Sequence, residues 1–170
     1  MATKWNLDPT HSEITFKVKH MMISNVKGNF RTFNAEIEAE DDTFTNAKTT
    51  ATIQTDSVFT NNTDRDNHLK SAEFFNCEAH PTITFESQKL NDQVIGNLTI
   101  NGITKPVTLD VDFGGINVDP WGNTKAGFSF EGKISRKDFG LNWNAALEAG
   151  GVMVSDDVKI SGELQFVKQA

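Results

Sequence analysis

The chain of 170 residues has one cysteine, no tyrosine and no long apolar run. The single cysteine, Cys77, excludes a disulfide within the chain and a cysteine-rich zinc cluster. The four histidines are too dispersed for a helical HExxH motif or a close pair of metal ligands, so we expect no metal site. No segment approaches the roughly 20 apolar residues that span a bilayer, and residues 1–5 lack the apolar region of a signal peptide. We therefore expect a soluble, cytoplasmic protein without a transmembrane segment, or a periplasmic one if the chain is a processed form.

Positive charge is also scarce. The 16 Lys and Arg are outnumbered by 23 Asp and Glu, which gives a formal net charge of −7. Nucleic-acid binding depends on clustered Lys and Arg, so this balance argues against nucleic acid as a partner, and against anionic membrane surfaces. Because thirteen Phe and three Trp stand without a single Tyr, most large side chains have no polar group to satisfy when buried, which suits an apolar interior.

What the chain has in abundance is alternation of apolar and polar residues, the pattern of strands with one buried face. In the first such run Ile14, Phe16, Val18 and His20 share one face. Similar runs cover 103–113, 126–134 and 158–166, and further strand-like runs lie near 26–40, 48–59, 82–90 and 93–101. The sequence thus predicts about eight strands.

Two local signals refine the strands. The apolar face of the second run is even-numbered at Phe30 but odd-numbered at Phe33, which predicts a β-bulge or sharp bend near Arg31 and Thr32. Asn101-Gly102 lies between two alternating runs and is a strong hairpin signal, because both residue types tolerate the positive φ of a tight turn.

Two segments break the strand pattern. Residues 61–72 indicate a helical turn that Asn62 or Thr63 caps, and residues 136–155 indicate loops or short helices. We expect short helical segments near 63–71 and 136–147, over the ends of the strands.

The fold class predicted is all-β, with residues 1–170 in a single domain. Eight strands with one apolar face could form a two-sheet sandwich, but closure into an antiparallel barrel removes exposed edges, so we favour the barrel. An eight-stranded barrel either is filled by side chains or holds one small ligand. Inward-facing glycines bear on this choice, since they either leave a lumen or only permit the strands to bend; they are Gly28, Gly96, Gly132 and Gly162.

Four polar residues are candidates for a ligand headgroup, and each has a structural alternative. His20 ends an inward face, where it is either a hydrogen-bonded core histidine or a donor to a ligand. Arg65 and His68 lie on one side of the predicted helical turn, where they face an anionic or carbonyl group or form a local salt bridge. Arg136 beside Asp138 raises the same alternatives at the second cap.

An ordered set of motifs resembles the YceI-like, or polyisoprenoid-binding, family from about residue 4 to residue 167. Each motif is weak alone, and together they form a strong pattern: Trp5-x-x-Asp8-Pro9-x-His11-Ser12, Phe16 and His20, Gly28-x-Phe30-x-x-Phe33, Arg65-Asp66-x-His68-Leu69, Phe74-Phe75, Pro81-x-Ile83-Thr84-Phe85, Gly96-x-Leu98-Thr99-Ile100-x-Gly102, Pro106-Val107 and Arg136-x-Asp138-Phe139-Gly140.

This resemblance implies an extended, lipocalin-like, eight-stranded antiparallel barrel around a long isoprenoid chain, such as a polyprenyl phosphate or a quinone, with no catalytic activity and no cofactor besides the bound lipid. A carrier or store of this kind would place the tail against Phe16, Val18, Phe30, Phe85, Phe128 and Phe130. The headgroup candidates are His20, Arg65, His68 and Arg136.

Two other functions remain as hypotheses. One is a structural or partner-binding barrel with a filled interior, for which a homodimer is compatible with the sequence. The other is an enzyme acting on a small amphiphile, with His20 or His68 as general base. The sequence has no nucleophile elbow, phosphate loop or evident triad, so we predict lipid binding in bacterial transport or storage rather than catalysis.

Overall fold

A computed structural model describes residues 2–21, 23–90, 92–141 and 154–169. The strands are β1 (Thr3–Leu7), β2 (Glu13–His20), β3 (Ser24–Phe30), β4 (Phe33–Ala39), β5 (Lys48–Gln54), β6 (Val58–Phe59), β7 (Thr82–Ser87), β8 (Gln93–Ile100), β9 (Ile103–Val118), β10 (Thr124–Ser135) and β11 (Val154–Lys168). The helices are the 3-10 turns η1 (Pro9–His11), η2 (Thr55–Ser57) and η3 (Arg136–Phe139) and the α-helix α1 (Thr63–Lys70).

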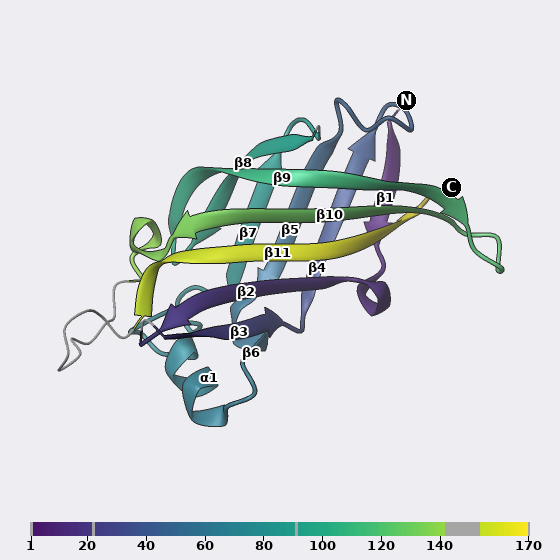
Figure 1. The fold of residues 1–170 in the computed structure, drawn as a ribbon. Coiled ribbons are helices and arrows are strands. Elements are labelled where there is room, and N and C mark those ends of the chain that lie inside the picture. The colour runs from purple at the N-terminus through teal and green to yellow at the C-terminus, as the bar shows by residue number, and fades with distance from the viewer. Residues whose placement is uncertain (1, 22, 91, 142–153, 170) are drawn as a thin grey trace.

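The strands form one antiparallel sheet that closes on itself. Their order is β1-β4-β5-β7-β8-β9-β10-β11-β2-β3-β6, and β1 pairs in addition with β11. Figure 1 shows β9, β10, β11, β2 and β3 side by side across the near face, with β4, β5 and β7 behind them. Closure leaves few backbone groups at free edges, which is the advantage of a barrel over an open sheet.

Three of the barrel strands are interrupted, which is why eleven elements make eight strands in the described part of the chain. β1 and β2 pair with successive parts of β11, and η1 lies between them. In the same way β4 continues β3, and β6 continues β5 after η2. The predicted all-β, eight-stranded antiparallel barrel is confirmed.

Both local strand signals are confirmed. β3 ends at Phe30 and β4 begins at Phe33, with a bend between them that keeps both rings on the inner side. At the hairpin between β8 and β9, Asn101 has φ 56° and Gly102 has φ 75°, as a two-residue turn with positive φ requires.

Of the two predicted helical segments, the structure describes the first in full and the second in part. α1 forms where expected, and the side chain of Asn62 caps it by accepting a hydrogen bond from the Arg65 amide at 3.0 Å. The second predicted segment begins with η3, whereas its residues 142–147 lie outside the described residues. None of the described helices is long and apolar enough to cross a membrane.

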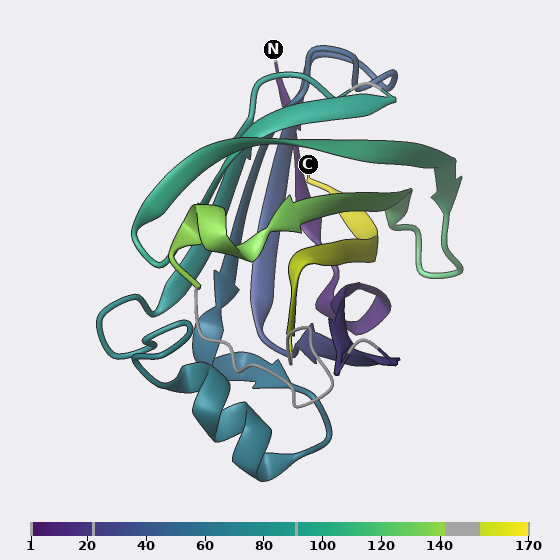
Figure 2. The ribbon, with the colours of Figure 1, turned by 60° about the vertical axis from the view of Figure 1, so that its left-hand side comes forward.

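Two apolar clusters lie at opposite ends of the barrel. One gathers near both chain termini around Trp5, Phe44 and Phe166. The other lies near α1 and η3 and includes Phe75 and Phe139. Figure 2 shows the termini at one end of the barrel and α1 at the other. Between the clusters the interior is not filled.

Candidate ligand-binding site

The barrel encloses a cavity of about 700 Å³ whose lining is almost entirely apolar. This volume is in the range of small-molecule sites, roughly 300 to 1,000 Å³. All six residues predicted to contact a lipid tail line it: Phe16, Val18, Phe30, Phe85, Phe128 and Phe130. The interior is therefore open to an apolar ligand, and the role of each residue in holding one stays a prediction.

The inward glycines neither simply leave a lumen nor only permit the strands to bend, which were the two alternatives that the sequence offered. A Cβ added at any of them would overlap a side chain on an adjacent strand; the pairs are Gly28 with Phe16, Gly96 with Phe85, Gly162 with Phe130 and Gly132 with Leu109. The space above three of these glycines is thus taken by a phenylalanine ring that leans over the backbone. Because the rings lie against the wall, they leave the centre of the barrel free.

One end of the cavity is closed by aromatic side chains. Phe44 comes from the loop between β4 and β5, is only 2% exposed, and has φ 63°. Its ring lies 5.2 Å from that of Trp5 and 5.1 Å from that of Phe128, centroid to centroid, and Phe128 also packs against Phe166. These rings form a plug, here defined as Trp5, Phe44, Phe128 and Phe166. Sequence reasoning missed Phe44, since a single Phe in a polar turn carries no periodic signal.

The opposite end of the cavity is polar. All four predicted headgroup residues line it there, together with Lys19, Asn62 and Asp64; the four are His20, Arg65, His68 and Arg136. They come from β2, α1 and η3, which are distant in sequence and are brought together by closure of the barrel. We call this end of the cavity the mouth.

Arg65 is held at the mouth by neutral partners. Its Nε donates to Oγ1 of Thr60 at 2.8 Å, and its Nη2 donates to the Thr60 carbonyl at 2.6 Å. Asp66 does not pair with it but accepts hydrogen bonds from the amide and the hydroxyl of Thr60. Within the described residues no carboxylate lies within ion-pair distance of Arg65. The half-buried guanidinium is therefore oriented without being neutralised.

Arg136 is bound to the wall. It is 3% exposed, and it donates to the carbonyls of Leu141 at 2.6 Å, Ser155 at 2.9 Å and Val154 at 3.2 Å. Burial lowers its pKa, and Asp156, with Oδ1 at 3.9 Å from Nη2, acts in the opposite direction. The bonds to Ser155 and Val154 join η3 to β11, which gives Arg136 a structural role. Its contact with a headgroup stays a prediction.

The two histidines at the mouth differ in their surroundings. Nε2 of His68 lies 2.7 Å from a carboxylate oxygen of Glu73, and its ring packs edge-on against Phe74. His20 ends β2, is half-buried, and has no side-chain hydrogen bond within the described residues. The ring nitrogens of His20 are therefore more available for a hydrogen bond to a ligand than those of His68.

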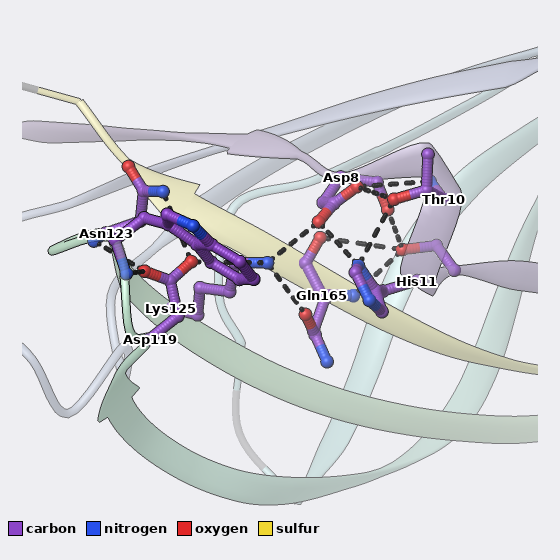
Figure 3. A network of polar contacts seen from close by, with 9 residues as sticks. Asp8, Thr10, His11, Asp119, Asn123, Lys125 and Gln165 are labelled. Atoms are coloured by element: carbon purple, nitrogen blue, oxygen red, sulfur yellow. Dashed lines mark hydrogen bonds and ion pairs between the residues drawn. The ribbon is translucent and has the colours of Figure 1, made fainter.

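A second polar cluster lies at the closed end, on the residues of the N-terminal motif (Figure 3). Nζ of Lys125 lies 2.9 Å from Oδ2 of Asp8 and 3.8 Å from Oδ2 of Asp119. Asp8 also accepts from the amide and hydroxyl of Thr10, and Nδ1 of His11 lies 2.8 Å from its Oδ2. Hydrogen bonds from Thr10 and then from Lys125 hold the pKa of Asp8 far below the usual range of a carboxyl group. The cluster ties η1 to β10 across the break between β1 and β2.

Fold and site together define a class of protein: a closed antiparallel β-barrel that surrounds an apolar cavity with a cationic mouth. The chain belongs to the YceI-like family, because the family model for the YceI-like domain matches residues 5–166. The family resemblance seen in the motifs is thereby confirmed.

Relatives and solved structures agree with this assignment. A UPF0312 protein of Staphylococcus epidermidis is 44% identical over 96% of this chain and 97% of its own length. The YceI protein of Campylobacter jejuni has a TM-score of 0.76 and 35% identity, covering 89% of this chain and 90% of that one. A polyisoprenoid-binding domain from Saccharophagus degradans has a TM-score of 0.75 at 14% identity, covering 97% and 98% of the two chains, and shows likeness of fold alone.

Proposed function

We propose that this protein carries or stores an amphiphilic isoprenoid lipid, with the tail in the barrel cavity and the headgroup at the mouth. The observation that carries the proposal is an apolar cavity of about 700 Å³ that ends at Arg65, a cation with neutral partners. The Saccharophagus degradans neighbour, described as polyisoprenoid-binding, supports the same ligand class.

The two parts of the site suit the two parts of such a ligand. Each buried methylene of the tail contributes about 0.8 kcal/mol before the costs of binding are subtracted. A guanidinium forms its strongest hydrogen bonds with phosphate or carboxylate oxygens, so Arg65 favours a polyprenyl phosphate, and a quinone carbonyl is the weaker acceptor. A barrel that served only as a structural module would have side chains packed through its centre, where this one has a cavity.

The test begins with organic extraction of the purified protein, followed by mass spectrometry of the extract. We expect an isoprenoid lipid, or binding of added polyprenyl phosphate or quinone to stripped protein. Repeated recovery of lipid-free protein that binds neither compound would contradict the proposal.

A variant that fills the cavity, compared with a matched variant on the outer face, tests where the lipid binds. Ala51 lines the cavity, whereas its neighbour Thr52 on β5 is exposed on the outer face. Ala51→Trp is expected to lose bound lipid because the indole occupies the space of the tail, and Thr52→Trp is expected to keep it. Equal lipid content in the two variants would show that the lipid binds elsewhere.

A further inference from the structure

The outer face of the barrel carries a row of lysines that the net charge of the chain conceals. In the register of the sheet Lys27 lies opposite Lys17, Lys17 opposite Lys159, and Lys159 opposite Lys133. The four residues follow one another across β3, β2, β11 and β10, which Figure 1 shows side by side. With strands about 4.8 Å apart, the row extends over roughly 14 Å.

Such a row is unfavourable for the fold itself, because like charges directly opposite one another on neighbouring strands destabilise a sheet. Only one of the four has a carboxylate within ion-pair distance among the described residues: Nζ of Lys133 lies 3.6 Å from Asp157. The next acidic residues in the register are Glu131, two residues from Lys133 on β10, and Asp110, which lies opposite Glu131 on β9. Lys17, Lys27 and Lys159 are therefore left without internal compensation.

The lysines line an outer groove of about 870 Å³, which lies on the other side of the barrel wall from the apolar cavity and shares Phe16 and Ile160 with it. Alternation along each strand explains the separation. Phe16 and Val18 point into the barrel, so Lys17 between them points out, and the same holds for Lys159 between Val158 and Ile160. The charged groups of the groove therefore face the outside of the barrel.

A second feature lies on the same hairpin. The turn between β2 and β3 presents two large apolar side chains to solvent, Met21 at 41% exposure and Ile23 at 81%. Lys19 precedes them on β2, and His20 beside them lines the mouth. Lysines that flank exposed apolar residues are the pattern of interfacial membrane binding, in which the apolar side chains enter the headgroup region and the cations face anionic lipid.

From these observations we infer that the β2–β3 hairpin and the lysine row dock the protein on an anionic phospholipid surface, with the mouth of the barrel at that surface. The charge of the row is complementary to such a surface, and the exposed apolar turn favours a bilayer over an anionic polymer, which offers no apolar layer. The net charge of −7 opposes binding of an anionic surface to the rest of the molecule. Docking of this kind requires no particular ligand in the lumen.

The experiment is co-sedimentation of the full chain with phosphatidylcholine vesicles, with and without phosphatidylglycerol, at low and at high salt. We expect binding to the anionic vesicles alone, weakened by salt. Each lysine near an anionic surface contributes about 1 kcal/mol, or roughly fivefold in affinity, so Lys17→Gln/Lys159→Gln should bind about 25-fold more weakly.

A matched pair of lysines serves as control. Lys48 on β5 and Lys105 on β9 are exposed and lie outside the row, so Lys48→Gln/Lys105→Gln makes the same change in net charge. We expect it to bind as the unaltered protein does, and Ile23→Ser to bind more weakly at equal charge. Equal losses in the two double variants, no binding to anionic vesicles, or retention by nucleic acid in place of vesicles would each overturn the inference. Extraction of the same samples keeps the two proposals apart, because lipid-free protein that still binds vesicles contradicts only the lumen ligand.

Discussion

The two ends of the barrel use charged residues in different ways. At the closed end Lys125 lies between the carboxylates of Asp8 and Asp119, so its charge is compensated and the contacts fix strands to one another. At the mouth Arg65 is held by the hydroxyl and carbonyl of Thr60, which orient the guanidinium and leave its charge. The kind of partner, more than the residue type, therefore separates a structural cation from one that is available to a ligand.

The largest effect is expected from breaking the aromatic plug. Phe44→Ala removes a ring that is 2% exposed and leaves a void among Trp5, Phe128 and Phe166, so we expect the free energy of unfolding to fall by about 3 to 5 kcal/mol. Urea denaturation measures this loss. Phe113→Ala is the comparison, since Phe113 also contacts Phe44 but is 42% exposed. A loss for Phe44→Ala no greater than that for Phe113→Ala would show that the plug does not support the closed end.

The next effect concerns the ion network of that end. Asp8→Asn leaves Lys125 with weaker partners, so we expect the free energy of unfolding to fall by about 1 to 3 kcal/mol at neutral pH. Because the pKa of Asp8 is depressed in the folded protein, its carboxylate stabilises the fold above the ordinary carboxyl pKa of about 4, and this contribution is lost as the pH falls below that value.

The stability difference between the unaltered protein and Asp8→Asn should therefore be constant from about pH 5 upward and narrow in acid. Thermal unfolding at several pH values measures it. Asp42→Asn, at a carboxylate that is 65% exposed, is the control and should change stability little. A difference that widens in acid would exclude this account of Asp8.

A smaller effect is expected at the mouth. Arg65→Gln removes the uncompensated cation, so affinity for a polyprenyl phosphate should fall about tenfold, as expected for one charge-assisted hydrogen bond. Affinity for a quinone with the same tail should change less, because its carbonyl carries no charge. Fluorescence titration of stripped protein with both lipids measures the ratio, and an equal loss for both would assign Arg65 to holding α1 rather than to the headgroup.

The smallest effect is expected on the wall between the two ends. At Gly28 the atoms nearest to an added Cβ belong to the ring of Phe16, which can move into the cavity, so Gly28→Ala should cost under about 1 kcal/mol and reduce the lipid content. At Gly162 it also meets the backbone oxygen of Glu13 at 2.6 Å, so Gly162→Ala should destabilise more. Urea denaturation with lipid extraction separates the two variants, and equal stabilities would contradict the packing described for these glycines.

Much of this architecture follows from alternation in the sequence. The strand faces, the bend at Arg31 and Thr32, and the hairpin at Asn101-Gly102 depend on local side-chain and turn preferences, which one sequence shows directly. Closure followed from the physical argument against exposed edges. The helical turn at α1 was likewise visible through its cap, Asn62.

The features that escaped prediction depend on contacts between distant segments. Phe44 acts as a plug only because its loop folds over the barrel end, and Thr60 orients Arg65 only because β6 leads into α1 beside the mouth. The lysine row is spread over residues 17 to 159 and exists only in the register of the closed sheet. Net charge, a property of composition, could not show it.

The rings that lean over glycines carry a consequence for how this lumen changes through evolution or engineering. Each phenylalanine occupies volume that the glycine on the next strand leaves empty, so substitution acts on the pair as one unit, and effects at Phe16 and Gly28 should not add. Exchanging the two members of a pair would conserve the bore, whereas enlarging the glycine alone would narrow it. The three Gly–Phe pairs lie on three separate pairs of strands, so the bore can be changed at one of them while the strands stay the same.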